Sequence, residues 1–223
     1  MTEDSDAAQH NTLIWAHAFL SSVVLENRLP ASAWHGALDV LRYDARGHGD
    51  GPAASDPAQL DWPALGTDLL AVADARALTS FVAGGVSMGA MTALCAALAA
   101  PQRVRALVLV SPPPLWQARA PHAAAFTRAS NLMQRRALRH PEAATLAILY
   151  AGAARANLPA PTALATLRDT PVLIVAWDGD PAHPLASAQA LKALLPHAAL
   201  VQLTGADDRA GRDAIDLFLR QQS

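Results

Sequence analysis

The chain has 223 residues, of which 52% are apolar, and its formal net charge is −2. A chain of this length suits a single α/β domain with one hydrophobic core. The slightly negative charge argues against a nucleic-acid or membrane-surface binder, because such proteins need a basic face. We therefore expect a small-molecule substrate, with no nucleic-acid and no membrane partner.

The first ten residues are acidic and polar, and they lack the basic start and apolar core of a secretory signal. We expect residues 1–10 to form a disordered tail. No apolar run approaches the roughly 18 residues of a membrane span, so a cytoplasmic location is expected. The single cysteine, Cys95, excludes an internal disulfide, and its small neighbours predict a buried structural thiol.

Short apolar runs alternate with helical stretches along residues 11–223. This alternation predicts the α/β class, with a mostly parallel sheet and helices on both of its faces. The predicted strands, in chain order, are 13–16, 40–43, 81–83, 104–110, 172–176 and 200–203. The predicted helices are a crossover at 26–38, then 61–77 with Asp61 as its cap, 88–100, 185–195 and 213–220.

The stretch from about residue 112 to 170 interrupts this alternation. It opens with three prolines and continues as alanine-rich helical sequence without an evident strand. Insertions at the carboxyl edge of an α/β sheet usually cover a ligand crevice, so we interpret it as a small helical cap; an ordinary crossover of two packed helices is the alternative. Its larger apolar side chains could line a pocket for an uncharged or apolar acyl group, or could instead simply pack the insertion onto the sheet: Leu115, Trp116, Phe126, Leu132 and Met133.

The segment Gly85-Val86-Ser87-Met88-Gly89 carries the strongest chemical signal. It is a G-x-S-x-G pattern between a predicted strand and a predicted helix. A serine on such a sharp turn is forced outward, and the turn needs small neighbours. The helix that follows would direct its free amide groups toward the serine oxygen. The pattern predicts a nucleophile elbow, with an ordinary glycine turn as the alternative.

Four segments, in the right order, resemble the α/β-hydrolase family of serine esterases and lactonases. They are Trp15-Ala16-His17-Ala18-Phe19, the loop Tyr43 to Gly49 (a D-x-R-G-H-G pattern), the elbow at 85–89, and Val172 to Pro181. The match covers most of residues 11–220, and the insertion resembles the family's cap in position and helical character. The family's usual first two strands have no evident counterpart.

The resemblance implies a role for each matching position. Ser87 would be the nucleophile, and the backbone amides of Phe19 and Met88 would form the oxyanion hole. Asp180 would be the acid that orients the base, with Asp178 as the alternative. Ala18 departs from the family's usual glycine and adds a methyl group near the oxyanion hole.

Two histidines and a charged pair match structural turns in the family. His17 and His48 are therefore expected to be structural, without a role in proton transfer. Asp44 and Arg46 are expected to fix the turn that holds them.

The family's catalytic histidine follows its last strand, but the corresponding loop, residues 203–211, contains none. Asp207 or Asp208 stands near the expected position, and a carboxylate with a pKa of about 4 is a poor base for serine. Removing the base from a working triad costs about 10⁶-fold in turnover. A histidine from elsewhere could substitute, so His183 and His122 are the candidate displaced bases, with His140 behind them.

Two functions follow from these observations. The first is a serine hydrolase that acts on a small ester, lactone or thioester through Ser87. The alternative is a catalytically impaired member of the same fold that serves as a small-molecule or protein binding module. The sequence implies no cofactor and no metal, since it has no dinucleotide fingerprint and no histidine-carboxylate cluster with ligand spacing. An imidazole nitrogen within about 3.5 Å of the Ser87 hydroxyl would discriminate the two functions.

Overall fold

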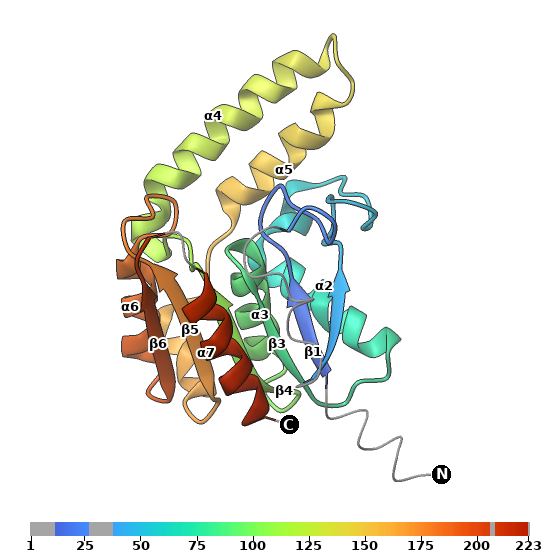
Figure 1. Ribbon diagram of the computed structural model, residues 1–223. Coiled ribbons are helices and arrows are strands. Elements are labelled where there is room, and N and C mark those ends of the chain that lie inside the picture. Colours follow the sequence, from blue (N-terminus) through green and yellow to red (C-terminus); the bar gives the residue numbers. More distant parts are fainter. Residues whose placement is uncertain (1–11, 27–37, 206–207, 223) are drawn as a thin grey trace.

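The computed structural model describes residues 12–26, 38–205 and 208–222. Its centre is a six-stranded sheet in the order β2-β1-β3-β4-β5-β6, and every neighbouring pair of strands is parallel. The strands are β1 (Thr12–Ala16), β2 (Asp39–Tyr43), β3 (Phe81–Val86), β4 (Val104–Val110), β5 (Val172–Trp177) and β6 (Ala198–Leu203). The predicted α/β class is confirmed (Figure 1). The expected tail and nearly all of the expected crossover helix lie outside the described residues.

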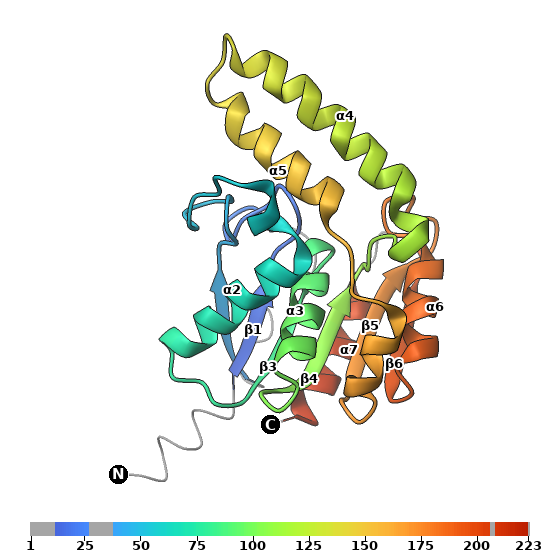
Figure 2. The same ribbon diagram turned by 180° about the vertical axis from the view of Figure 1, so that it is seen from behind.

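Helices cover both faces of this sheet. The cluster on one face joins alternate strand residues to α2 (Trp62–Ala75), α3 (Met88–Ala99) and α6 (Leu185–Leu194). The cluster on the other face includes Ile215 and Leu219 of α7 (Arg209–Arg220). Figure 2 shows α2 and α3 in front of the strands, with α7 behind them. Both faces of the central strands are therefore buried, which explains why β3, β4 and β5 are nearly continuous apolar runs.

The local signals of the sequence place the elements well. Asp61 caps α2, since its side chain accepts a hydrogen bond from the amide of Ala64 at 2.9 Å. The strand at β3 continues three residues beyond the predicted 81–83, because glycines 84 and 85 still pair with β4. Helix α7 begins four residues earlier than predicted, and Leu217 on this helix faces solvent.

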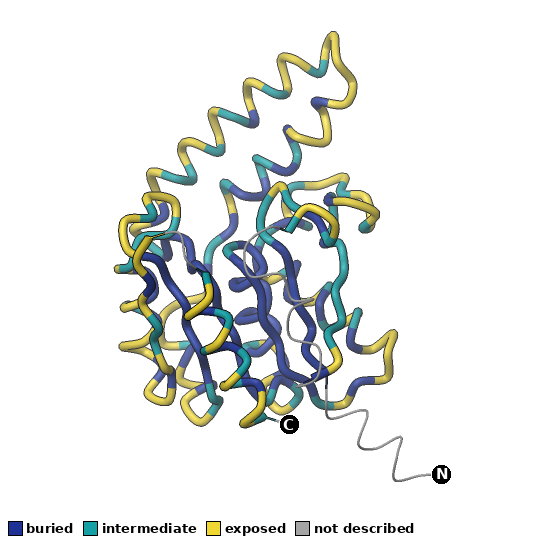
Figure 3. The backbone as a smooth tube through the Cα atoms, in the orientation of Figure 1, coloured by how far each residue is buried: buried dark blue, intermediate teal, exposed yellow. Residues whose placement is uncertain are grey.

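The insertion is helical, as predicted, and contains no strand among its residues. It consists of the 3-10 helix η3 (Trp116–Arg119), the helices α4 (Ala120–Ala137) and α5 (Ala143–Arg155), and the 3-10 helix η4 (Pro161–Leu167). Helices α4 and α5 form an antiparallel pair that projects from the carboxyl edge of the sheet (Figure 1). Most of α4 is exposed, while the part of α5 nearest the sheet is buried (Figure 3). The insertion thus stands beside the strand ends where ligands bind in α/β sheets.

Cys95 lies in α3 and is buried, as expected, and burial raises the pKa of its thiol to about 12. Within the described ranges, no helix has both the length and the apolar character that a bilayer crossing requires.

Candidate active site

Ser87 occupies the sharp turn between β3 and α3 in a backbone conformation that is unusual for serine. Its φ is 54° and its ψ is −109°. A left-handed φ outside glycine costs about 1–3 kcal/mol and is found mainly at functional sites. The turn also brings α3 very close to β1: a Cβ on Gly85 or Gly89 would lie 2.3 or 2.0 Å from the carbonyl oxygen of Ala16. Both glycines of the motif are therefore required by packing, and Ser87 is held in the geometry of a nucleophile elbow.

The hydroxyl of Ser87 contacts an imidazole from the other half of the chain. His183 Nε2 lies 2.9 Å from Ser87 Oγ, and His183 Nδ1 lies 3.0 Å from Asp180 Oδ2. The carboxylate can only accept, so Nδ1 carries the proton and Nε2 is free to accept the serine hydroxyl hydrogen. Serine, imidazole and carboxylate thus form one hydrogen-bonded chain in the arrangement of a catalytic triad.

The loop between β5 and α6 supplies both the carboxylate and the imidazole. Asp180 Oδ1 accepts hydrogen bonds from the amides of Ala182 at 2.9 Å and His183 at 3.2 Å. Such aspartate-to-backbone bonds define a tight turn, and Gly179 enters it with a φ of 73°. The side chains of Asp180 and His183 are 15% and 21% exposed, so the pair is largely shielded from solvent. One turn of chain therefore orients the base and its carboxylate together.

Among the described residues, none of the other sequence-derived candidates forms a hydrogen bond with the Ser87 hydroxyl. His122 lines the same pocket, but it has no hydrogen bond to the serine. His140 is exposed near the tip of the α4–α5 pair and lies 3.5 Å from Glu142. Asp178 is exposed. Asp207 lies outside the described residues, and Asp208 precedes α7.

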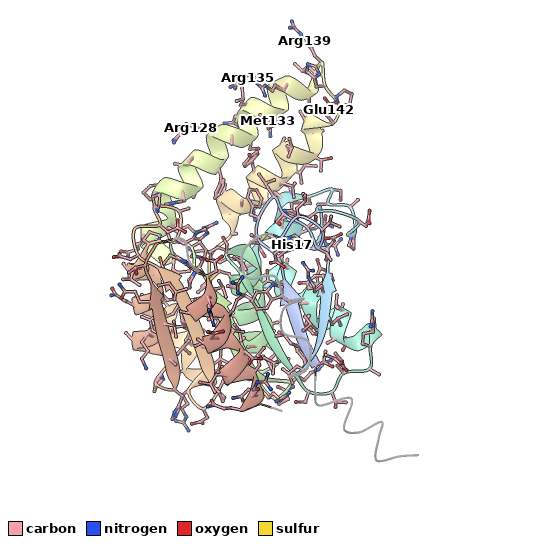
Figure 4. All side chains as sticks on the ribbon, viewed as in Figure 1. His17, Arg128, Met133, Arg135, Arg139 and Glu142 are labelled. Atoms are coloured by element: carbon pink, nitrogen blue, oxygen red, sulfur yellow. The ribbon has the colours of Figure 1, made fainter. Side chains whose placement is uncertain are left out.

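The segment after β1 is fixed by His17. The amide of Ala45 donates to His17 Nε2 at 3.0 Å, so the ring must donate from Nδ1 to the Ala18 carbonyl, 2.8 Å away. The amide of Ser21 donates to the same carbonyl at 3.1 Å. Because a peptide unit is planar and trans, anchoring the Ala18 carbonyl also fixes the direction of the Phe19 N–H. Figure 4 labels His17 at the upper end of the sheet.

Asp44 and Arg46 hold the neighbouring loop, but through different partners. Asp44 accepts from the amides of Val23 at 2.7 Å and Asp50 at 2.9 Å. Desolvation raises the pKa of Asp44, but these two bonds and the nearby histidines outweigh it, so the net pKa is lowered. Arg46 instead forms a two-pronged ion pair with Asp68 on α2, with both contacts at 2.8 Å. The expectation of a turn-fixing pair is therefore wrong as to the pairing: Asp44 holds the turn through backbone amides, whereas Arg46 ties the loop to α2.

The two histidines of this region predict a pH-dependent stability. Burial lowers the pKa of His17 and of His48 from the ordinary value near 6.5. The unfolded chain therefore binds more protons than the native state when the pH falls below about 6.5. We expect the free energy of unfolding to decrease as the pH falls from about 7 to about 5, as measured by urea denaturation.

The matched control for this pH effect is the double variant His17→Asn/His48→Asn. Its stability is lower at neutral pH, but its slope with pH over the same range should be much flatter. An unchanged slope in the double variant would contradict the assignment to these two side chains.

A cavity of about 370 Å³ opens beside Ser87. Its walls come from the elbow, the segment after β1, η2 (Pro57–Leu60), the start of α2, the end of β4 and the insertion. The ring of Phe19 packs edge to face against two rings of the insertion, with centroid distances of 5.5 Å to Phe126 and 5.6 Å to Tyr150. These contacts join the insertion to the site. The cavity is lined by Ala18, Phe19, His48, Leu60, Trp62, Val86, Ser87, Met88, Ser111, Pro113, Arg119, His122, Phe126, Leu149, Ala153, Ala156, Ala182 and His183.

Of the insertion residues that were expected to line the pocket, only Phe126 does so. Phe126 lines the cavity, whereas Leu115 is buried in the core under the sheet edge. Trp116 donates its indole N–H to the carbonyl of Pro159 at 2.7 Å. Leu132 is exposed, and Met133 lies farther along α4 (Figure 4). Leu132 and Met133 do not line the pocket because α4 projects beyond the sheet, and only its first turns reach the pocket.

The pocket also contains three residues that the sequence did not predict to lie there. Arg119 and Ser111 were not singled out, and His48 was expected only in a structural turn. His48 donates from Nδ1 to the Arg46 carbonyl at 3.0 Å, yet it also lines the pocket. Ser111 has a φ of 48° at the end of β4. No local pattern marks Arg119, since its position depends on how the insertion folds back over the sheet.

Within the part of the chain that the structure describes, no three His, Cys, Asp or Glu side chains gather into a group that could hold a metal ion.

Comparison with known proteins gives a consistent picture. The family model described as alpha/beta hydrolase fold matches residues 11–167. Comparison with the curated proteins found no significant match. Among solved structures, a hydrolase from Pseudomonas aeruginosa PA01 is 23% identical with a TM-score of 0.68, and the alignment covers 96% of this chain and 90% of that one.

Two further structures share the architecture. The enol-lactonase from Burkholderia xenovorans LB400 is 21% identical, with a TM-score of 0.66 over 95% of this chain and 89% of that one. A structure from a study of carboxylesterases of the thaumarchaeon Nitrososphaera gargenis is 16% identical, with a TM-score of 0.72 over 96% and 92%. At these identities the likeness shows the fold alone. The family model, however, spans well over half of the sequence, and the chain therefore belongs to the α/β-hydrolase fold family.

Proposed function

We propose that the protein is a serine hydrolase that cleaves a small ester, lactone or thioester, with Ser87 as its nucleophile. One observation carries the proposal: Ser87 Oγ, His183 and Asp180 are linked by contacts of 2.9 and 3.0 Å in the protonation pattern that nucleophilic catalysis needs. The family membership and the esterase and lactonase names of two similar structures support the same class of reaction.

In the first half of the proposed reaction, Ser87 Oγ attacks the carbonyl carbon while His183 Nε2 takes the hydroxyl proton. Asp180 stabilises the resulting imidazolium and keeps its ring in place. The carbonyl oxygen becomes an oxyanion, which the amides of Phe19 and Met88 would bind. Met88 is the first residue of α3, so its N–H has no acceptor within the helix. One such donor typically stabilises the transition state by about 2.7–4 kcal/mol.

The tetrahedral intermediate then collapses, the carbon–oxygen or carbon–sulfur bond breaks, and His183 returns the proton to the leaving group. In the second half a water molecule attacks the acyl-serine, again losing its proton to His183. The second tetrahedral intermediate collapses, the bond between the acyl carbon and Ser87 Oγ breaks, and His183 returns the proton to Oγ as the acid leaves. The strained elbow is suited to this cycle because it presents Ser87 above the strand ends, beside the amide of Met88.

The alternative of an impaired binding module depended on the lack of a base. Asp207 and Asp208 stand where the family's histidine is expected, but His183 Nε2 lies 2.9 Å from Ser87 Oγ, and this contact supports the hydrolase over the binding module. The loop after β5 would thus supply both the acid and the base of the triad, which other proteins of the family take from two separate loops. The proposed hydrolase needs no residue from the loop after β6.

The proposal predicts esterase activity that depends on Ser87. Purified protein should hydrolyse p-nitrophenyl esters of short and medium acyl chains, because the cavity is lined mainly by apolar side chains. The Ser87→Ala variant should lose at least about 10³-fold in kcat. Its thermal unfolding temperature serves as the folding control. Equal activity in both proteins, or none in the wild type toward any ester, lactone or thioester tested, would refute the proposed function.

A further inference from the structure

The pocket beside Ser87 contains a buried positive charge that the proposed reaction does not use. Arg119 ends η3 and begins the insertion's helical pair, and it is only 5% exposed. Its guanidinium lies 4.2 Å from the ring centre of Trp62 and 5.9 Å from that of Phe126. Trp62, Phe126 and Arg119 all line the cavity that also holds Ser87.

The partners of this guanidinium are neutral. Nε donates to the carbonyl of Ala156, and Nη2 donates to the carbonyl of Ala153 at 2.8 Å. Among the described residues, no Asp or Glu forms an ion pair with Arg119, and none of the residues lining the cavity is acidic. The remaining nitrogen, Nη1, has no hydrogen-bond partner in the described part of the chain.

If Arg119 only connected η3 to the end of α5 through hydrogen bonds, its positive charge would not be needed. Two carbonyl acceptors can be satisfied by a neutral donor, whereas burying an uncompensated charge is costly. Burial lowers the pKa of Arg119 to about 10, which still leaves the group charged at neutral pH. The cavity therefore combines apolar walls with one permanent positive charge.

A second observation also points to a polar ligand group in the cavity. Ser111 is 1% exposed and lines the same cavity, and its Oγ has no hydrogen-bond partner among the residues that the structure describes. His122 Nδ1 is likewise buried without a partner at this cavity. Buried polar atoms are nearly always paired, so these atoms are available to hydrogen-bond a bound molecule.

We propose that Arg119 binds a carboxylate of the substrate, so that the protein acts on an ester, lactone or thioester that carries a separate carboxylate on a short apolar body. This inference rests on the proposed hydrolase function and deepens it. It replaces the expectation of an uncharged substrate, which came from the apolar residues of the insertion, with a singly anionic one. Guanidinium groups suit this task because they bind carboxylates through paired donors.

The kinetic test uses pairs of substrates that differ only in charge. Monoethyl esters of four- to eight-carbon dicarboxylic acids place the carboxylate in the acyl part, and O-acetyl esters of ω-hydroxy acids place it in the alcohol part. Each is compared with the corresponding neutral carboxamide. We expect kcat/KM to favour the carboxylate by about tenfold or more in at least one series, and Arg119→Gln to remove that preference.

The control variant is Arg128→Gln, which removes an arginine from the same helical pair. Arg128 is exposed on α4 and points away from α5 (Figure 4). It should keep the wild-type preference, while Arg119→Lys should retain part of it. A wild-type enzyme without any preference, a preference that survives in Arg119→Gln, or an equal loss for charged and neutral substrates in that variant would overturn the inference.

A binding experiment separates this inference from the proposed reaction. Hexanoate and hexanamide are titrated calorimetrically into the Ser87→Ala protein and into Ser87→Ala/Arg119→Gln. Hexanoate should bind the first protein more tightly than hexanamide, and this difference should vanish in the second. Esterase activity without selective hexanoate binding would overturn only the role of Arg119. Selective binding without any ester hydrolysis would overturn the hydrolase, and with it the substrate named here, while leaving Arg119 as a carboxylate-binding residue.

Discussion

Replacing His183 with glutamine is expected to lower kcat for ester hydrolysis by about 10⁴- to 10⁶-fold. Glutamine can still contact the Ser87 hydroxyl, but it cannot accept its proton at neutral pH. The Asp180→Asn variant should lose about 10⁴-fold, because an amide no longer fixes the Nδ1–H tautomer or stabilises the imidazolium. The measurement is steady-state or single-turnover hydrolysis of a p-nitrophenyl ester.

His122→Gln is the comparison variant for this prediction, because His122 lines the same cavity and is the other candidate base. The Ser87 hydroxyl is hydrogen-bonded to His183 and not to His122, so this replacement can weaken substrate binding and raise KM, but it should change kcat by less than about tenfold. Circular dichroism and thermal unfolding should match the wild type in all three variants. A large loss in His122→Gln together with a small loss in His183→Gln would show that the base comes from the insertion instead.

Replacing Gly89 with alanine is expected to reduce the free energy of unfolding by about 3 kcal/mol or more. The new Cβ would lie 2.0 Å from the Ala16 carbonyl oxygen and 2.8 Å from that of His17. Both are backbone atoms, so helix α3 would have to move away from β1. For a chain of this size, the loss corresponds to a fall of about 6–12 °C in Tm.

The Gly205→Ala variant separates this steric effect from the loss of a glycine alone. Gly205 has a φ of 73°, and a Cβ there would have no heavy atom within 4 Å from any described residue other than its chain neighbours. Its replacement should therefore cost only the backbone strain of about 1 kcal/mol. Equal destabilisation in the two variants, measured by urea denaturation, would contradict the close approach of α3 to β1.

The sheet and the elbow could be predicted because their signals are local. Apolar runs mark strands buried on both faces, and Asp61 marks the start of α2 by a cap within its own turn. Ser87 lies between a strand and a helix in a pattern that requires glycine on both sides. Each of these features depends on interactions between residues close in sequence or on the simple alternation of the chain.

The place of His183 could not be predicted, because it depends on distances across the sheet. Ser87 follows β3 and His183 follows β5, with β4 between them and 96 positions separating them in the sequence. The histidine reaches the serine only because the Asp180 turn directs it back over the strand ends. The sequence showed a histidine three residues after the predicted acid. That spacing predicts neither the direction of the turn nor the distance from His183 to Ser87 across β4.

Arg119 was missed for a similar reason. Its neighbours in the cavity come from α2, α4 and the end of α5, which approach one another only when the insertion folds back. An arginine in an alanine-rich helical stretch resembles a solvated surface residue. Only the structure reveals that its charge is buried and has no acidic partner in the described part of the chain.

The most direct test of the central claim is the rate of fluorophosphonate labelling, followed by intact mass. If Ser87 is activated by His183, the wild-type protein should gain one label, and Ser87→Ala should gain none. The His183→Gln variant should label at least about 10³-fold more slowly than the wild type. An unlabelled wild type, or a His183→Gln variant that labels as fast as the wild type, would contradict the triad of Ser87, His183 and Asp180.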